Sequence, residues 1–275
     1  MDIGVFAKDY QRSSVEAVLA ACAANGFPIA QFNTISAGLE PMPDAIPADV
    51  VEHIRTASRT AGVQIVSFSA TFNMIHPDPA VRQTGLRRLA VLAAAANELG
   101  VPVLSLCTGS RDPDNMWHHH PDNLLPDAWS DLLVTMRSAV AIAEQFDVYL
   151  GVEPEPGNVV RTSAHADRLL AELETDRIGI VLDPANLLGD DLSPDAVIEA
   201  IDTGLELLAD RTIVAHGKDR FADGTVAAPG QGIVPWGRFM AGLDAVGFAG
   251  PFILHGFPIE QAPAAAAYVR SQMPA

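Results

Sequence analysis

The sequence predicts an α/β fold of the (βα)8 TIM barrel type, arranged as a single domain over residues 1–275. Eight short apolar runs, each suited to a buried strand, alternate strictly with segments of helical periodicity. Each strand and helix together take roughly 30 residues, which is typical of parallel βαβ units. An open, doubly wound sheet is the alternative. That fold usually carries a glycine-rich phosphate loop after its first strand, and residues 4–8 contain none.

The strands are expected at the eight apolar runs. Continuous apolar character, rather than alternation of apolar and polar residues, is typical of strands buried on both faces of a parallel sheet. In chain order the expected strands are Ile3–Phe6, Ile29–Phe32, Val63–Phe68, Val103–Cys107, Val148–Val152, Ile178–Leu182, Thr212–Ala215 and Phe252–Leu254.

The helices are expected between these runs, and two of them carry clear end signals. Ser13 with Glu16 has the spacing of a capping box, and Gly26 is placed to end the same helix. Ser193-Pro194 opens a later helix whose apolar residues recur on one face. The other helices are expected around Ala48–Thr60, Pro79–Leu99, Trp129–Gln145, Ala164–Leu173, Trp236–Val246 and Gln261–Met273.

The composition argues against nucleic-acid-binding, membrane-binding and disulfide-stabilised proteins. The chain has 49% hydrophobic residues and a formal net charge of −17. This charge opposes binding to nucleic acid or to anionic membranes, because both need clustered Lys and Arg. Cys22 and Cys107 are the only cysteines, and the first residues show neither a basic leader nor a long apolar run. We therefore expect a cytoplasmic protein without a disulfide framework.

Candidate functional residues stand directly after the last four expected strands. Glu153, Asp183, His216 and His255 each follow such a strand. In (βα)8 barrels the carboxyl ends of the strands form the reaction face, so these side chains are expected to converge. Two carboxylates and two imidazoles suit a divalent metal ion, with Mn²⁺ as the first expectation and Co²⁺, Zn²⁺, Fe²⁺ or Mg²⁺ as alternatives.

Each of these residues also has a purely structural interpretation. Glu153 could form a salt bridge inside the barrel, and Asp183, which precedes Pro184, could cap a turn. A lone histidine such as His216 or His255 is often a buried polar residue with a satisfied hydrogen bond. The positions of all four after consecutive strands favour the metal site.

Several motifs around these residues resemble the xylose isomerase-like superfamily of sugar phosphate isomerases and epimerases. The motifs are Glu153-Pro154-Glu155-Pro156-Gly157-Asn158, Leu182-Asp183-Pro184-Ala185-Asn186-Leu187, His216-Gly217-Lys218-Asp219, Gly230-Gln231-Gly232 and Gly250-Pro251-Phe252-Ile253-Leu254. The resemblance implies a (βα)8 barrel whose metal ion is held by a Glu, an Asp, a His and a second Glu. Glu153, Asp183 and His216 match the first three, and a homo-oligomer is a further expectation from the resemblance alone.

The sequence departs from the family pattern at two positions. His255 stands where the pattern has its second glutamate, and Asn186 stands where the family often has a histidine. The resemblance implies that the two glutamates act as an acid/base pair on opposite faces of the substrate. The change at His255 is therefore expected to alter proton transfer, while imidazole keeps the capacity to bind metal.

Other polar residues are expected to shape a substrate pocket at the same face. Asn73 and His76 follow the third expected strand, and Trp117 lies in a long polar loop after the fourth. An indole can cover an apolar sugar face while neighbouring donors and acceptors contact hydroxyl groups. Asn186 and Lys218 are expected to orient substrate oxygens.

The leading functional hypothesis is a divalent-metal-dependent isomerase or epimerase that acts on a sugar or sugar-like keto compound through an enediolate. Glu153, His255 and Lys218 are the expected catalytic residues, because they combine acid/base groups with a cation near the proposed oxyanion. The alternative is a metal-dependent lyase or dehydratase that removes the same proton and then eliminates a β-substituent from a keto-sugar or keto-inositol. An abasic-site endonuclease and a non-catalytic sugar-binding barrel are further rivals, and the first conflicts with the acidic charge.

Overall fold

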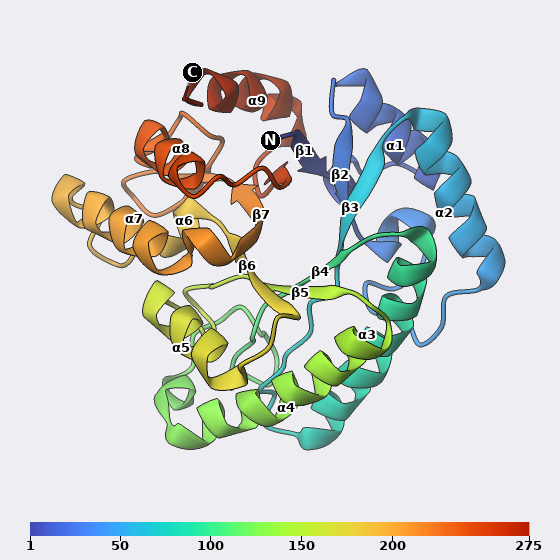
Figure 1. The fold of residues 1–275 in the computed structure, drawn as a ribbon, viewed down its shortest axis with the longest axis horizontal. Helices are drawn as coiled ribbons and strands as arrows, with labels where there is room; N and C mark the ends of the chain where they lie inside the picture. The colour runs from blue at the N-terminus through green and yellow to red at the C-terminus, as the bar shows by residue number, and fades with distance from the viewer. Residues whose placement is uncertain (275) are drawn as a thin grey trace.

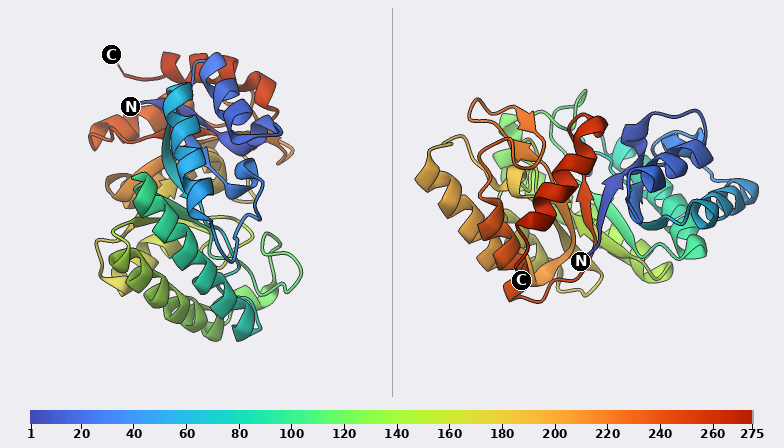
Figure 2. Two further views of the ribbon diagram at one scale, coloured as in Figure 1. Left: turned by 90° about the vertical axis from the view of Figure 1, so that its right-hand side faces the viewer. Right: turned by 90° about the horizontal axis from the view of Figure 1, so that it is seen from above.

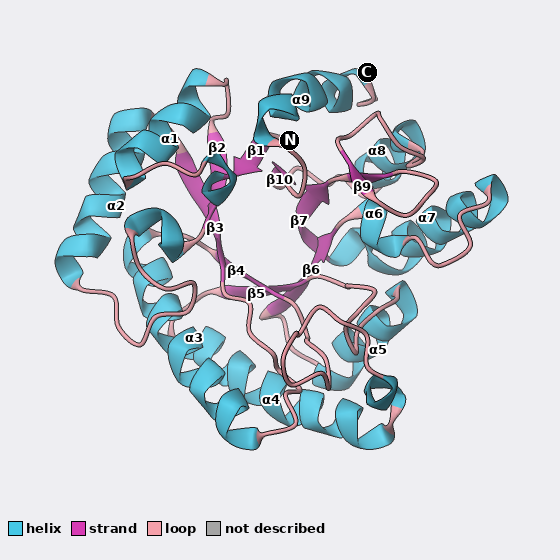
Figure 3. Ribbon diagram, turned by 180° about the vertical axis from the view of Figure 1, so that it is seen from behind, coloured by secondary structure: helices cyan, strands magenta, loops and turns pink. Residues whose placement is uncertain are grey.

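Eight parallel strands close into a barrel in the computed structural model, which describes residues 1–274. Around the barrel the strands follow the order β1, β10, β7, β6, β5, β4, β3, β2. Their bounds are β1 Ile3–Phe6, β2 Ile29–Phe32, β3 Gln64–Ser69, β4 Val103–Leu106, β5 Tyr149–Val152, β6 Ile178–Leu182, β7 Thr212–Gly217 and β10 Phe252–Leu254. Figure 3 shows these strands as an inner ring. The predicted (βα)8 TIM barrel is confirmed, with strand ends displaced by one or two residues.

The helices surround the ring of strands, as Figures 1 and 2 show. Their bounds are α1 Val15–Ala24, α2 Ala48–Ala61, α3 Pro79–Leu99, α4 Pro126–Gln145, α5 Ser163–Leu173, α6 Pro184–Leu187, α7 Pro194–Leu208, α8 Trp236–Ala245 and α9 Ala262–Ser271. A two-stranded antiparallel pair, β8 Asp219–Arg220 and β9 Val226–Ala227, lies in the segment after β7. The single-turn helix α6 begins directly after Asp183, at the carboxyl end of β6.

The ends of the helices show why the chain turns where it does. Ser14, and not the expected Ser13, is the N-cap of α1, and its hydroxyl accepts a hydrogen bond from the Ala17 amide at 3.3 Å. The capping-box assignment was therefore wrong by one residue. Gly26 takes a φ of 80° just beyond the end of α1, a backbone conformation that glycine adopts at little cost. Ser193 precedes α7, with Pro194 at its first turn, as expected.

Apolar side chains fill the interior of the barrel. One compact cluster draws its members from seven of the eight strands, namely Phe6, Ile29, Val66, Val103, Val181, Val214 and Ile253. The eighth strand contributes Gly151, where an added Cβ would lie 2.7 Å from the Val181 side chain and 3.2 Å from that of Val103. The larger apolar core lies between the strands and the surrounding helices.

This interior packing determines which later residues point over the barrel axis. Side chains alternate between the two faces of a strand, so a residue two positions beyond an inward one also points inward. Asp183 stands two positions beyond Val181, and His216 stands two positions beyond Val214. The same spacing relates Glu153 to Gly151 and His255 to Ile253. The candidate residues therefore cap the packed interior at the carboxyl ends of their strands.

Within residues 1–274, no helix combines the length and the apolar composition that crossing a bilayer requires.

Candidate metal centre

The four residues predicted as metal ligands come together in the structure. One ligand atom each from Glu153, Asp183, His216 and His255 lies within 4.8 Å of the other three. Their strands, β5, β6, β7 and β10, are consecutive neighbours in the barrel. Asp183 and His216 are only 1% and 2% exposed, so the cluster lies deep in the mouth of the barrel. Buried carboxylates and imidazoles at this spacing could hold one divalent cation.

Two direct contacts join the members of the cluster in pairs. The Nε2 atom of His255 lies 3.0 Å from Oδ2 of Asp183. The Nδ1 atom of His216 lies 3.3 Å from Oε1 of Glu153. The two imidazole rings are 4.4 Å apart between centroids. Each imidazole therefore faces a carboxylate.

His216 has one free ring nitrogen, and the other is held by a polar pair. Its Nε2 lies 3.0 Å from Oε1 of Gln31, and the hydroxyl of Ser67 donates to the same oxygen at 2.9 Å. An amide oxygen accepts hydrogen bonds, so the hydrogen of His216 is expected on Nε2. Among residues 1–274, the buried Nδ1 has no hydrogen-bond partner. An orphaned lone pair that faces a carboxylate fits a metal ligand, since buried polar atoms are rarely left unsatisfied.

Lys218 lies among three carboxylates beside the cluster. Its Nζ is 3.3 Å from Asp183 Oδ2, 3.8 Å from Glu155 Oε1 and 3.9 Å from Glu153 Oε1. Burial alone would lower the pKa of Lys218, but the neighbouring carboxylates Asp183, Glu155 and Glu153 outweigh it and raise this pKa above its usual range. One ammonium faces three carboxylates, so the pocket has an excess of negative charge that suits a cation.

The carboxylates respond to the same surroundings in different ways. Burial alone would raise the pKa of Asp183, but Lys218 and the His255 hydrogen bond outweigh it, and the pKa lies well below its ordinary value. The pKa of Glu153 is likewise lowered, because His216 and Lys218 outweigh the effect of burial. Burial raises the pKa of Glu155 to about 7, and Lys218 only partly offsets this. Burial also lowers the pKa of His255 to about 4, so this imidazole is neutral at pH 7.

Asn186 belongs to the cluster through Glu153. Its side-chain amide donates to Oε1 of Glu153 at 2.9 Å, and it is only 5% exposed. The short helix α6 positions Asn186 three residues after Asp183, and the Asp183 side chain caps that helix through the Ala185 amide at 2.9 Å. The Asp183 side chain thus caps a turn, as one interpretation of the sequence predicted, and also belongs to the cluster.

The residues expected in the substrate pocket show mainly contacts within loops. The Asn73 amide donates to the Ser110 carbonyl oxygen at 2.7 Å, which joins the loop after β3 to the loop after β4. His76 accepts a hydrogen bond from the Asp78 amide at 3.0 Å. Trp117 is 49% exposed. These contacts give Asn73 and His76 a role in loop structure, and substrate contact by either residue or by Trp117 stays a prediction.

Three polar residues near the cluster were missed by the sequence reasoning. Gln31 and Ser67 form the polar pair behind His216, and Glu155 contacts Lys218. A signal for Gln31 was present, because it is the one polar residue in the run Ile29–Phe32. Glu155 was visible within the motif after β5, but a second acid beside a strand end has no distinctive spacing.

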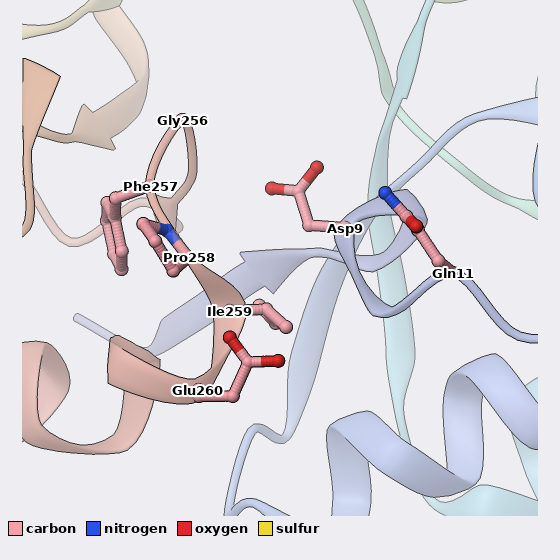
Figure 4. A pocket seen from close by; sticks show the side chains of 7 residues that line it. All are labelled: Asp9, Gln11, Gly256, Phe257, Pro258, Ile259 and Glu260. Carbon is pink, nitrogen blue, oxygen red and sulfur yellow. The ribbon is translucent and has the colours of Figure 1, made fainter.

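A cavity of about 440 Å³ opens beside His255, between the segment after β1 and the segment after β10. Asp9, Gln11 and Glu260 supply its polar side chains. Figure 4 shows the Asp9 carboxylate pointing into the space between the two segments. Burial raises the pKa of Asp9, with a smaller opposing effect from Lys8. Carboxylate and amide oxygens of this kind accept hydrogen bonds from hydroxyl groups.

Several solved structures share this fold, and two of them are sugar epimerases by name. D-Psicose 3-epimerase from Clostridium cellulolyticum H10, in a structure with D-tagatose, is similar with a TM-score of 0.77 at 15% identity, over 100% of both chains. 3-Keto-D-glucoside 4-epimerase from E. coli gives a TM-score of 0.74 at 15% identity, over 98% of this chain and 99% of that one. The IOLI protein with a bound zinc atom gives 0.73 at 15% identity, over 99% and 96%. At 15% identity, this structural similarity establishes the fold alone.

Comparison of sequences gives the family directly. No curated protein matches the sequence at a significant level. The family model described as xylose isomerase-like TIM barrel matches residues 19–272, which is most of the chain. The resemblance drawn from the motifs after β5, β6 and β7 is thereby confirmed. The chain belongs to the xylose isomerase-like TIM barrel family.

Proposed function

We propose that the protein is a divalent-metal-dependent isomerase or epimerase that acts on a sugar or sugar-like keto compound. The observation that carries the proposal is the convergence of Glu153, Asp183, His216 and His255, with the Nδ1 lone pair of His216 left free for a ligand. The family assignment supports it, as do the names of two structural neighbours, a keto-glucoside 4-epimerase and a psicose 3-epimerase.

Glu153, Asp183, His216 and His255 would hold the metal ion, with Mn²⁺ as the first expectation. A bound divalent cation would polarise a substrate carbonyl and acidify the neighbouring C–H bond. Co²⁺, Zn²⁺, Fe²⁺ and Mg²⁺ stay alternatives, because mixed oxygen and nitrogen ligands do not select one of these ions.

Glu153 is the proposed group that removes the proton from the carbon beside the carbonyl. Its Oε1 is fixed by the Asn186 amide at 2.9 Å, and Lys218 lies 3.9 Å from the same atom. The lowered pKa of Glu153, which reflects His216 and Lys218 acting against burial, keeps this carboxylate ionised and ready to accept a proton. The product of that step is an enediolate, and the Lys218 ammonium could donate a hydrogen bond to its oxygen.

His255 takes the position of the second family glutamate. Its imidazole, neutral in the metal-free protein and 3.0 Å from Asp183, would take up a proton from solvent and deliver it to the other face of the substrate, and so invert one centre. Asp9, Gln11 and Glu260 line the neighbouring cavity and could receive the hydroxyl groups of the same substrate. We therefore assign one acid/base group to each face of the substrate and a polar space beside them.

A lyase or dehydratase is the second candidate, and the residue that favours it is His255. Proton removal by Glu153 is common to both reactions. Elimination then needs a group that protonates the leaving hydroxide, and it does not need two equivalent carboxylates on opposite faces. An imidazole in place of the second glutamate therefore suits a keto-sugar or keto-inositol dehydratase.

The test is solvent exchange in D₂O with metal-loaded protein and a panel of ketohexoses, keto-glucosides and keto-inositols, followed by NMR. An isomerase or epimerase gives deuterium at the carbon beside the carbonyl together with an isomeric product. Loss of water and a new enone absorbance would instead identify the lyase. Glu153→Gln is expected to abolish exchange, whereas Glu144→Gln, an exposed change on α4, should leave it intact. Equal exchange by wild type and Glu153→Gln would contradict the assigned role.

A further inference from the structure

A second cavity, of about 410 Å³, lies outside the cluster, and the segments that carry cluster residues form its walls. Pro156 and Gly157 follow Glu155, and Leu187 and Leu188 follow Asn186. Arg220 stands two residues beyond Lys218 and completes a third wall. The cavity therefore borders the reaction face between the segments that follow β5, β6 and β7.

The charge of this cavity is opposite to that of the chain. The protein has a formal net charge of −17, yet Arg161 and Arg220 both line the cavity. Arg220 donates to the carbonyl oxygens of Leu188, Gly189 and Gly224, at 3.1, 3.2 and 3.2 Å. Those acceptors carry no full charge. Within residues 1–274 no carboxylate lies within ion-pair distance of Arg220, so its positive charge is not neutralised by a neighbour.

In the part of the chain that the structure describes, Arg161 has no comparable hydrogen bonds to backbone carbonyl oxygens. In residues 1–274 it is the only half-buried arginine without a hydrogen bond or an ion pair, since the other arginines without partners are exposed. A guanidinium that loses part of its hydration without gaining an acceptor is unfavourable unless a ligand supplies one. Asp190 is the one acidic residue lining the cavity, and it is exposed and forms no ion pair with either arginine.

The backbone adds a second positive feature to the same cavity. Thr162, another lining residue, is the N-cap of α5, and of the helix amides its hydroxyl accepts that of His165, at 3.2 Å, while it also lies 3.1 Å from His165 Nδ1. The first amides of the helix Ser163–Leu173 therefore remain available to an anion at the positive end of the helix dipole. His119 also lines the cavity and adds a potential donor.

We propose that this cavity is an oxyanion site that binds a carboxylate or phosphate group through Arg161, Arg220 and the N-terminus of α5. Guanidinium groups match the paired oxygens of both anions in a bidentate manner. The assignment of this anion to the substrate rests on the proposed function. It implies that the natural substrate is an acidic sugar derivative, whose charged end lies in this cavity while its carbonyl end lies at the cluster.

The test is a titration of the metal-free protein with inorganic phosphate at low ionic strength, followed by isothermal titration calorimetry. Metal-free protein prevents phosphate from binding to a metal ion at the cluster. We expect saturable binding that weakens about tenfold in Arg161→Gln, the loss expected for one charge-assisted contact. Arg137→Gln is the matched control, because Arg137 is an exposed arginine on α4 and removal of its charge should change affinity less than about twofold.

An acetate titration distinguishes the two sources of the anion. Tighter binding of acetate than of phosphate would assign a carboxylated ligand, and the reverse would assign a phosphorylated one; both support the site. Absence of saturable binding to wild type, or equal affinity in wild type and Arg161→Gln, would overturn it. Inorganic phosphate has no carbonyl group, so its binding reports on the anion site alone. If phosphate binds through Arg161 but the protein exchanges no proton of neutral, carboxylated or phosphorylated keto-sugars, the proposed function is refuted and the anion site stands.

Discussion

Replacement of Gln31 by leucine tests how the barrel prepares His216 for a metal ion. Gln31 is 2% exposed, and its Oε1 accepts from Ser67 and contacts His216 Nε2 at 3.0 Å. Leucine has a similar size but no acceptor, so the hydrogen of the imidazole can move to Nδ1. That atom then loses the lone pair that faces Glu153. The expected consequence is weaker metal binding with the fold preserved.

The magnitude follows from the contact that is lost. Removal of a hydrogen bond that orients a histidine ligand typically weakens metal affinity about 10- to 100-fold. This corresponds to about 1.4 to 2.8 kcal/mol of binding free energy. The substitution also leaves the Ser67 hydroxyl and a ring nitrogen without an acceptor, which is expected to lower the free energy of unfolding by about 1 to 3 kcal/mol. Both effects are measurable in a folded protein.

The assay combines a chelator-competition titration with ¹⁵N NMR of the histidine side chains. Wild type should show His216 protonated at Nε2, and Gln31→Leu should show a mixture of tautomers. Gln31→Glu is the matched variant, because a carboxylate keeps the acceptor and should retain both the tautomer and the affinity. Metal affinity in Gln31→Leu within about twofold of wild type would refute the reasoning, since the lost contact is expected to cost at least tenfold.

Three other predictions follow from the structure. Asp219 is fully buried and should hold the segment after β7 in its folded conformation. It accepts hydrogen bonds from the Gly230 and Val234 amides at 3.0 Å and from Trp236 Nε1 at 2.9 Å. Asp219→Ala should lower the free energy of unfolding in urea by about 3 to 5 kcal/mol, and exposed Asp244→Ala by less than about 0.5. Chelation of a metal present at about 100 times its Kd should lower Tm by about 5 °C. The lost metal binding removes about 2.7 kcal/mol of stabilisation, and the unfolding entropy is about 0.6 kcal/mol/K for a chain of this length. An unchanged Tm in differential scanning calorimetry would argue against a bound metal. In metal-free protein, burial lowers the pKa of His255 to about 4 from 6.5, so its stabilising contribution is complete above pH 6.5 and is lost as pH falls toward 4. Relative to His255→Gln, wild type should therefore lose up to about 3 kcal/mol of stability across this window, and parallel pH profiles would contradict the shift.

The fold was predictable because each strand of a parallel barrel requires a short apolar run in the sequence. Each run packs against the barrel interior on one side and against helices on the other, so it must be apolar throughout. Exact ends were less accessible: Ser13 and Ser14 are adjacent candidates for one N-cap, and only the Ala17 contact separates them. The pair β8 and β9 was missed, because two-residue strands carry no periodicity.

The cluster was predictable where chemistry coincides with a strand end. Glu153, Asp183 and His216 are polar residues that follow apolar runs, and the alternation of side chains then requires them to point inward. Gln31 lies within a strand and contacts His216 at a sequence separation of 185 residues. No local pattern encodes such a pairing. The positive cavity around Arg161 likewise depends on four segments, those after β4, β5, β6 and β7, that only the folded barrel brings together.

The central claim is tested most directly by metal content. Elemental analysis of purified protein, after loading with Mn²⁺ and removal of excess metal, should find one equivalent in wild type. Asp183→Asn and Glu153→Gln should each lose it while retaining the wild-type circular dichroism spectrum, and Asp195→Asn, an exposed change in the first turn of α7, should retain it. Undiminished metal in folded Asp183→Asn and Glu153→Gln would contradict the ligand set and the function built on it.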